Sequence, residues 1–470
     1  MGKYRYLLKN IGLLTLSNFA TKLLSFFLVP LYTAVLTTGQ YGTYDLFNTT
    51  IGVLIPILTV NILEAVLRFG MDKNYNKQAI VTLSGKWLII STLIVGIIII
   101  LNHFFRVFPI LDEYKIYFFL MFFVQALSGI ITSYARGTDN VASLSVSSVI
   151  ASVFTIMCNI IFLIPFKWGL VGYFLANIIG PFMQCLYLLI RLRIWKYINI
   201  RERFLEEEKE MIRYSSPMIA NSVSWWINNV SDRYIVTWFC GIAANGIYSV
   251  STKIPTILNI FQTIFNQAWA LSAVKDFDSE DKKGFFSNTY RAYNCLLVIV
   301  CSLIIASDKL LAKFLYINQF YIAWKYVPFL TIAILFGSMS GYLGGFFTAT
   351  KDSKQYATST VWGAIVNIVL NLSLVPVMGV IGAAFATAVA YEIVWVIRLF
   401  QSKKYIKLKI NWKRDVVAYV LLNVQTIFLL LIENDILLYL SQLICIFVLL
   451  LIYKSDIWLF VGKALRAKEK

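Results

Sequence analysis

Three basic residues stand inside long apolar runs of the sequence: Lys22, Arg233 and Lys253. A charged side chain at membrane depth is costly, so it faces either a partner of opposite charge or a water-filled path for a transported species. These residues therefore favour a cationic site that attracts an anionic substrate. Internal ion pairs, of Arg233 with Asp232 or of Lys22 with Glu64, are the alternative.

Acidic residues inside the apolar runs carry a second kind of chemistry. Glu64, Asp232 and Glu392 lie among apolar residues, where carboxylates commonly take part in the movement of ions or protons. They are the candidates for ion coupling. They also leave open a multidrug or organic-cation antiporter, which would prefer an acidic, aromatic cavity, although the three embedded cations count against it.

Uncharged polar residues recur on single faces of several apolar runs. Ser148, Ser152, Thr155 and Asn159 follow one another at helical spacing and share one face of a helix. Such a stripe either lines a cavity or lets two helices pack closely, and the sequence leaves both open. The complete set of candidate cavity-lining residues is Asn18, Ser25, Ser148, Ser152, Thr155, Asn159, Asn221, Asn228 and Thr256.

The elements that carry these residues follow from the composition. Of 470 residues, 59% are hydrophobic and only 14% are charged, against about 25% charged in a soluble domain. A membrane-spanning helix needs about 20 apolar residues. The chain is therefore predicted to be an all-α polytopic membrane protein with about fourteen spans, at 10–36, 41–68, 80–102, 115–136, 141–165, 168–193, 210–239, 243–274, 288–312, 325–349, 356–376, 379–400, 414–432 and 436–453.

The basic residues are distributed unevenly between the two sides of this arrangement. With the N-terminus inside, 33 of the 42 Lys and Arg residues fall in cytoplasmic segments, 6 fall outside and 3 lie within spans. Cytoplasmic loops carry such an excess of positive charge. We therefore expect both termini in the cytoplasm, contacts with anionic membrane lipids, and no nucleic-acid partner, although the formal net charge is +18.

Several chemistries are excluded by what the sequence lacks. His103 is the only histidine, and the six cysteines form no CxxC pair, so we expect neither a metal site nor a cofactor. No G-x-x-x-x-G-K-[ST] phosphate loop occurs. We therefore do not expect ATP hydrolysis. A membrane-embedded glycosyltransferase would carry a sizeable extramembrane loop with catalytic carboxylates, and no outside loop is long enough. The sequence predicts a protein that is not an enzyme, while a non-transporting scaffold remains a further alternative.

The two halves of the chain repeat each other. Gly42-Thr43-Tyr44 has a counterpart in Gly246-Ile247-Tyr248, and a later proline and two glycines recur at nearly the same offset: Pro165, Gly169 and Gly172 against Pro376, Gly379 and Gly382. Six spans separate the copies, so both have the same orientation, as in parallel-repeat transporters. The predicted organisation is an N-terminal six-helix lobe (1–193), a linker (194–213), a pseudo-symmetric six-helix lobe (214–400), and a region with two extra spans and a basic tail (401–470).

Two stretches of the sequence resemble a known family. The first stretch contains Asn18-Phe19-Ala20, Pro30-Leu31-Tyr32 and Gly39-Gln40-Tyr41-Gly42. The second begins with Tyr214-Ser215-Ser216-Pro217 and continues with Asn228-Asn229-Val230-Ser231-Asp232-Arg233-Tyr234-Ile235-Val236. It ends with Gly246-Ile247-Tyr248-Ser249-Val250-Ser251-Thr252-Lys253-Ile254. The chain is similar to Wzx-type polysaccharide-biosynthesis flippases of the multidrug/oligosaccharidyl-lipid/polysaccharide exporter superfamily. The resemblance implies two MATE-like lobes that move by alternating access.

The resemblance also implies a substrate and a place in the cell. Such proteins move an undecaprenyl-diphosphate-linked oligosaccharide to the outer leaflet of the bacterial cytoplasmic membrane for O-antigen, capsule or exopolysaccharide assembly, beside a polymerase and glycosyltransferases. Lys22, Arg233 and Lys253 would bind the diphosphate, with Arg136 at the cytoplasmic entrance. Arginine offers a two-pronged fork to phosphate oxygens, whereas lysine acts as a point charge.

Overall fold

The computed structural model describes residues 26–458 except Lys73, Ile200, Asp276, Lys283 and Lys351. Within this part the chain consists of helices joined by turns and short connections, without a β-strand. The prediction of an all-α protein is confirmed. Lys22, Asn18 and Ser25 lie outside the described residues, as does most of the first predicted span.

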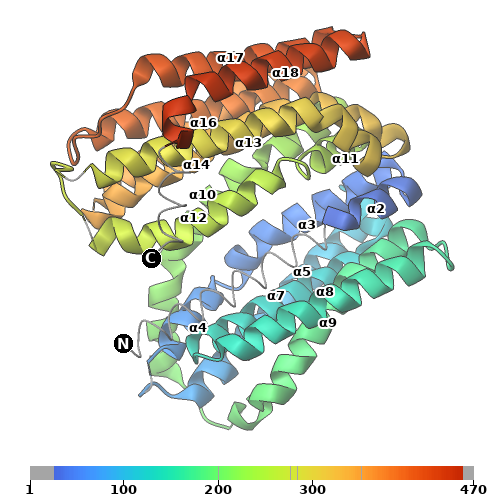
Figure 1. Cartoon of the computed structure of the whole chain (residues 1–470). Helices are drawn as coiled ribbons and strands as arrows, with labels where there is room; N and C mark the ends of the chain where they lie inside the picture. The colour runs from blue at the N-terminus through green and yellow to red at the C-terminus, as the bar shows by residue number, and fades with distance from the viewer. Residues whose placement is uncertain are drawn as a thin grey trace. The chain divides into compact units, whose positions relative to one another are not determined.

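The chain divides into two compact units, Met1–Ser231 and Asp232–Lys470. The boundary falls within one long helix, α10 (Leu205–Cys240). Unit 1 holds the earlier helices (Figure 1): α2 (Val29–Val35), α3 (Thr38–Leu58), α4 (Ile62–Gly70), α5 (Lys77–Phe105), α6 (Pro109–Glu113), α7 (Lys115–Gly137), α8 (Val141–Leu163), α9 (Gly169–Leu192) and the 3-10 helix η1 (Ile194–Tyr197).

Unit 2 holds the later helices: α11 (Ile242–Ser251), α12 (Thr256–Lys275), α13 (Phe285–Leu315), the 3-10 helix η2 (Asn318–Lys325), α14 (Val327–Ala349), α15 (Ser353–Met378), α16 (Val380–Ser402), α17 (Trp412–Leu431) and α18 (Asp435–Ile452). Its core combines aromatic rings from three helices. Trp269 of α12 stacks on Tyr342 of α14 at 4.1 Å between ring centroids, and the Tyr342 hydroxyl donates to the carbonyl of Phe286 in α13.

Ten helices of the described part are long and apolar enough to cross a membrane. They coincide with ten of the predicted spans, which confirms a multi-pass membrane protein. The predicted span 243–274 is divided between α11 and α12, and 210–239 lies within α10.

The predicted span 41–68 is broken. Helices α3 and α4 meet there at 64°, and together they would form an eleventh crossing. Pro56 in the last turn of α3 cannot donate a helix hydrogen bond. Val60 and Asn61 then adopt left-handed backbone angles, with φ of 53° and 50°. The chain therefore turns where its apolar pattern continues.

The two most closely packed helices of unit 1 are α8 and α9, which lie side by side (Figure 1). Gly180 of α9 makes the approach possible, because a Cβ at that position would lie 1.8 Å from the Thr155 hydroxyl oxygen and 2.8 Å from the Ala151 carbonyl oxygen. Glycine at a helix crossing is a common means of close packing in membranes.

We expect Gly180→Ala to destabilise the protein by about 1–3 kcal/mol, since the added methyl group forces α8 and α9 apart. Gly85→Ala in α5 is the matched control, because a Cβ there meets nothing within 4 Å. Thermal unfolding of both purified variants measures the difference. Equal unfolding temperatures would contradict the tight crossing at Gly180.

The C-terminal helix pair is fixed to α13 by buried polar contacts. Gln425 of α17 accepts a hydrogen bond from the Ser302 hydroxyl at 2.8 Å. Nearer the start of α13, the Asn294 side-chain oxygen accepts from the Tyr419 hydroxyl at 2.8 Å, and the Asn294 amide donates to the Tyr453 hydroxyl at 3.1 Å. In an apolar surrounding such polar contacts specify the partner helix. They hold α17 and α18 on unit 2 in one register.

Candidate functional site

A buried polar cluster in unit 2 is centred on Asp232 of α10, whose side chain is 7% exposed. The Tyr248 hydroxyl of α11 donates to one carboxylate oxygen, and the Thr387 hydroxyl of α16 lies 3.4 Å from the same atom. The other carboxylate oxygen accepts from the backbone N–H of Arg233 at 2.9 Å. Three helices thus converge on one carboxylate.

The cluster continues through two asparagines of α15, one helical turn apart. The Asn367 amide donates to the Thr387 hydroxyl at 3.4 Å, and the Asn371 amide donates to the Asn367 side-chain oxygen at 3.1 Å. Both side chains are buried, at 4% and 0% exposed. The Asn371 side-chain oxygen has no hydrogen-bond partner in the part of the chain that the structure describes.

This arrangement suits a small monovalent cation or a proton. Carboxylate, amide and hydroxyl oxygens are the ligands that hard cations prefer. A single carboxylate among neutral oxygens balances one positive charge, since buried charge is tolerated only when it is compensated. Among the described residues no group of three or more His, Cys, Asp or Glu side chains gathers as a transition-metal site would require.

The sequence-predicted cations have different surroundings. Arg233 follows Asp232 on α10 and is half-buried. Lys253 is also half-buried, in the turn between α11 and α12, and makes no ion pair among the described residues. Arg136 is exposed in the last turn of α7. The structure therefore brings two of the predicted basic residues into unit 2, both partly accessible.

The other predicted acids stand apart from the cluster's hydrogen bonds. Glu64 in the first turn of α4 and Glu392 in α16 are both half-buried. Neither forms an ion pair with another residue in the described ranges. Among the described residues, Asp232 is the one of the three candidates for ion coupling that has a network of hydroxyl and amide groups around it.

The polar stripe of α8 lies partly against α9. Ser148 accepts a hydrogen bond from the Gln184 amide of α9 at 3.4 Å, and Thr155 faces Gly180. The Ser152 hydroxyl donates to the Ser148 carbonyl at 3.0 Å, while Asn159 is buried and donates to the Thr155 carbonyl at 2.8 Å. Ser148 and Thr155 therefore contact α9, whereas the hydrogen bonds of Ser152 and Asn159 stay within α8.

The remaining predicted polar residues lie on α10 and α12. Asn221 is exposed and Asn228 is half-buried, and the Asn228 amide donates to the Ser224 carbonyl at 3.0 Å. Thr256 begins α12 and its hydroxyl donates to the Lys253 carbonyl at 2.5 Å. The neighbouring Trp226 donates its indole N–H to the Thr49 carbonyl at 2.7 Å, so it packs within unit 1.

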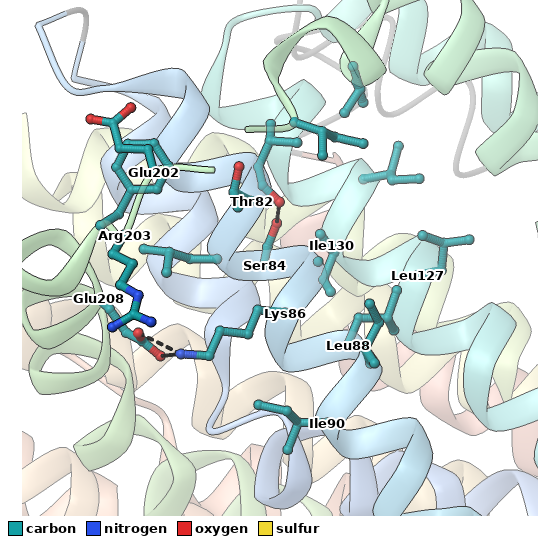
Figure 2. A pocket seen from close by; sticks show the side chains of 18 of the residues that line it. Thr82, Ser84, Lys86, Leu88, Ile90, Leu127, Ile130, Glu202, Arg203 and Glu208 are labelled. Atoms are coloured by element: carbon teal, nitrogen blue, oxygen red, sulfur yellow. Dashed lines mark hydrogen bonds and ion pairs between the residues drawn. The ribbon is translucent and has the colours of Figure 1, made fainter. Parts of the chain in front are cut away.

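A separate cavity of about 960 Å³ lies within unit 1 (Figure 2). Its walls are mostly apolar and come from α5, α7, α9, η1 and the start of α10, with Leu88 and Ile130 as examples. At its edge the Lys86 ammonium contacts both carboxylate oxygens of Glu208, at 2.7 and 2.8 Å. Figure 2 shows these two side chains pointing toward each other.

Only part of this site could be recognised from the sequence. Asp232 was found because it is a carboxylate in an apolar run. Asn367 and Asn371 were missed, although their four-residue spacing inside the span 356–376 is the pattern that was recognised in α8. Thr387 and Tyr248 had no chemical signal of their own, because their role depends on which helices meet.

Comparison with known sequences gives three matches. The family described as "Polysaccharide biosynthesis protein" matches residues 7–271. The chain is 21% identical over 223 residues to Agl15 of Haloferax volcanii, described as a probable low-salt glycan biosynthesis flippase, over 46% of each protein. It is 22% identical over 318 residues to an uncharacterized membrane protein of Methanocaldococcus jannaschii, over 62% of this chain and 58% of the other. The chain therefore spans about half the length of the curated relatives it matches.

Comparison with solved structures concerns the fold. The lipid II flippase MurJ, in an inward closed conformation, superposes with a TM-score of 0.68 at 14% identity over 95% of this chain and 98% of its own. An inward-facing multidrug resistance MATE family transporter of the MOP superfamily gives 0.65 at 13% identity, over 82% and 94%. The helices described above therefore share the fold of both proteins.

Proposed function

The chain belongs to the polysaccharide biosynthesis protein family, whose match covers more than half of its length, and from this premise we propose that it is a flippase for a lipid-linked oligosaccharide. The substrate would be an undecaprenyl-diphosphate-linked repeat unit, moved from the inner to the outer leaflet of the bacterial cytoplasmic membrane. The product would feed the assembly of O-antigen, capsule or exopolysaccharide, next to the polymerase and glycosyltransferases of the same pathway.

One observation carries this proposal. A member of a polysaccharide-biosynthesis family is built, in its described part, mostly of helices, and ten of these are apolar and long enough to cross a membrane. The crossing of a lipid-linked sugar is a step of polysaccharide assembly that takes place within a membrane. A glycoside hydrolase would typically use paired carboxylates beside the sugar instead.

The physical barrier to that crossing explains why embedded cations matter. Moving an ion into hydrocarbon has an idealised cost of order 20 kcal/mol, and a diphosphate carries more than one charge. We propose that Lys22, Arg233 and Lys253 lower this barrier by contacting the diphosphate, with Arg136 at the entrance. The lipid tail would remain in the bilayer, so that only the head group needs protein contacts.

The movement would be alternating access of two six-helix lobes, 1–193 and 214–400, joined by the linker 194–213. We propose fourteen spans in total, with both termini in the cytoplasm and the pair in 401–470 added to the second lobe. The charge asymmetry of the sequence supports this topology. Asn221, Asn228 and Thr256, with Asn18 and Ser25, would supply uncharged hydrogen bonds to the passing sugars.

The cluster at Asp232 supports an ion-coupled mechanism. A cation or proton bound by the carboxylate would neutralise its charge and weaken the hydrogen bonds that it accepts from Tyr248 and Thr387. Because these residues come from α10, α11 and α16, binding would bias the packing of three helices. Glu64 and Glu392 are secondary candidates for the same role.

The same cluster favours one alternative, an ion-coupled multidrug or organic-cation antiporter with this fold. The buried carboxylate of Asp232 suits that activity, whereas Arg233 beside it would repel a cationic drug. The two functions differ in what accumulates when the chain is missing from the cell.

Deletion of the gene that encodes the chain tests the proposed flippase function. We expect lipid-linked oligosaccharide to accumulate on the cytoplasmic side and surface polysaccharide to be lost, with unchanged sensitivity to organic cations. Mass spectrometry of extracted lipid intermediates makes the measurement. Normal surface glycan together with increased sensitivity to cationic drugs would instead establish the antiporter.

A further inference from the structure

A second, polar cavity of about 440 Å³ lies in unit 2, at the beginning of α17. It is formed where the segment that precedes α17 passes the first turns of α13. Its walls are three basic side chains, one amide, one indole and one aliphatic side chain: Arg291, Lys409, Lys413, Asn411, Trp412 and Ile410. The residues come from two parts of the chain more than a hundred positions apart in sequence.

The backbone beneath these side chains is held in place. The Lys409 N–H donates to the Ser287 hydroxyl oxygen at 2.9 Å, and Ser287 itself donates to the Asp281 carboxylate. Two residues earlier, the Lys407 N–H donates to the Ser279 carbonyl at 3.0 Å. The segment before α17 is therefore fixed against the connection between α12 and α13, so Lys409 is presented from a defined position.

The other walls are fixed as well. The Arg291 guanidinium contacts the Asp456 carboxylate at 2.6 Å, and Asp456 also pairs with Arg414. The Asn411 side-chain oxygen accepts from the Arg414 N–H at 3.3 Å and so caps α17. Preorganised groups bind a ligand with a smaller loss of conformational entropy than mobile ones.

The charges around the cavity do not balance. Arg291 and Arg414 are matched by Asp456 and by Asp415, which pairs with Arg414 at 2.8 Å. Lys409 and Lys413 are exposed and form no ion pair within the described residues. The cavity therefore carries a surplus of two positive charges, which an anion would neutralise.

We propose that this cavity binds the phosphate of an anionic membrane lipid, whose acyl chains lie along the adjoining face of α17. Trp412, Val416 and Val420 continue from the cavity at four-residue intervals and are 39%, 48% and 56% exposed. Apolar side chains on that face suit hydrocarbon, and tryptophan is typical of the level of lipid head groups.

The apolar track distinguishes a lipid from a soluble phosphate. A free phosphate would use only the basic residues, whereas a lipid would also use the face of α17. Basic pockets between membrane helices on the cytoplasmic side bind anionic head groups. The proposed topology places this end of α17 on that side. Since the cavity is separate from the Asp232 cluster, the inference does not depend on which substrate the protein transports.

The experiment compares two double variants that each remove two charges from the same segment. Lys409→Gln with Lys413→Gln empties the cavity of its unpaired cations. Lys403→Gln with Lys404→Gln is the control, because those lysines lie over the rings of Phe400 and Tyr405 and do not line the cavity. All four side chains are exposed, so both proteins should fold.

Native mass spectrometry in an equal mixture of phosphatidylglycerol and phosphatidylcholine measures the bound lipid. We expect the wild type and the control to retain phosphatidylglycerol in preference to phosphatidylcholine. In the Lys409/Lys413 variant the ratio of bound phosphatidylglycerol to bound phosphatidylcholine should fall by about tenfold or more. Addition of glycerol phosphate should not displace the lipid from the wild type.

Three results would overturn the inference. Retention of the full preference by the Lys409/Lys413 variant would rule out the cavity as the binding site. Equal losses in both double variants would show a general effect of surface charge. Displacement by glycerol phosphate at concentrations equal to the lipid would identify the occupant as a free phosphate.

Discussion

Arg233→Ala is expected to lower transport of the lipid-linked oligosaccharide by about a hundredfold, while the protein still folds and inserts. A charge-assisted hydrogen bond contributes about 1.5–3 kcal/mol, and Arg233 would make two of them to one diphosphate. Asp232 keeps its contacts with Tyr248 and Thr387 in this variant, so the local packing should persist. Complementation of a deletion strain at native expression levels provides the measurement.

A graded series separates charge from geometry at this position. Arg233→Lys should retain partial activity, because the charge remains and the two-pronged fork is lost. Arg233→Glu should be worse than alanine, since it adds repulsion to the lost contact. Lys253→Ala and Lys22→Ala should also fail. Lys313→Ala, which removes an exposed lysine at the end of α13, is the control and should be fully active.

Full complementation by Lys22→Ala, Arg233→Ala and Lys253→Ala, each tested singly, would contradict the cationic mechanism. Ion pairing inside the protein, of Arg233 with Asp232 or of Lys22 with Glu64, would then be the alternative role. The antiporter based on Glu64 and Asp232 would become the better account of the chain.

Asp232→Asn should uncouple transport from its driving ion. The amide has nearly the same shape as the carboxylate and can accept from Tyr248, but it carries no charge to hold a cation or exchange a proton. We expect the dependence of transport on an imposed Na⁺ or H⁺ gradient to disappear. The measurement is the initial transport rate in vesicles with and without each gradient.

Two substitutions of Thr387, one that keeps the hydroxyl and one that removes it, test the same network. Thr387→Ser keeps the hydroxyl between Asp232 and Asn367 and should remain coupled. Thr387→Val has the same shape without the hydroxyl and should weaken coupling by about tenfold, the effect of one buried hydrogen bond. If Asp232→Asn keeps the wild-type gradient dependence, the cluster does not couple transport to an ion.

The sequence predicted those parts of the fold that depend on local composition. Ten spans were located because a run of apolar residues is sufficient to mark a membrane helix. The break between α3 and α4 was missed, because it depends on left-handed backbone angles at Val60 and Asn61 within an apolar run. Backbone conformation at single residues leaves little trace in hydropathy.

The site was predicted less completely than the spans. Asp232 was identified from its charge alone, whereas Asn367 and Asn371 are neutral and resemble ordinary helix-packing residues. Tyr248 belongs to the repeated glycine-tyrosine motif, yet its bond to Asp232 follows from the meeting of α10 and α11. The cavity at Arg291 and Lys409 likewise joins distant residues, so it becomes visible only in the folded chain.

Transfer of the substrate across a bilayer by the purified protein tests the central claim most directly. The protein is reconstituted in vesicles that contain a fluorescent undecaprenyl-diphosphate oligosaccharide, and the fraction of sugar accessible to an external lectin or glycosidase is followed over time. We predict that the wild type makes the inner pool of sugar accessible from outside, and that Arg233→Ala does so about a hundredfold more slowly. Equal exposure in vesicles with the wild type and in protein-free vesicles would contradict the proposal that the chain is a flippase.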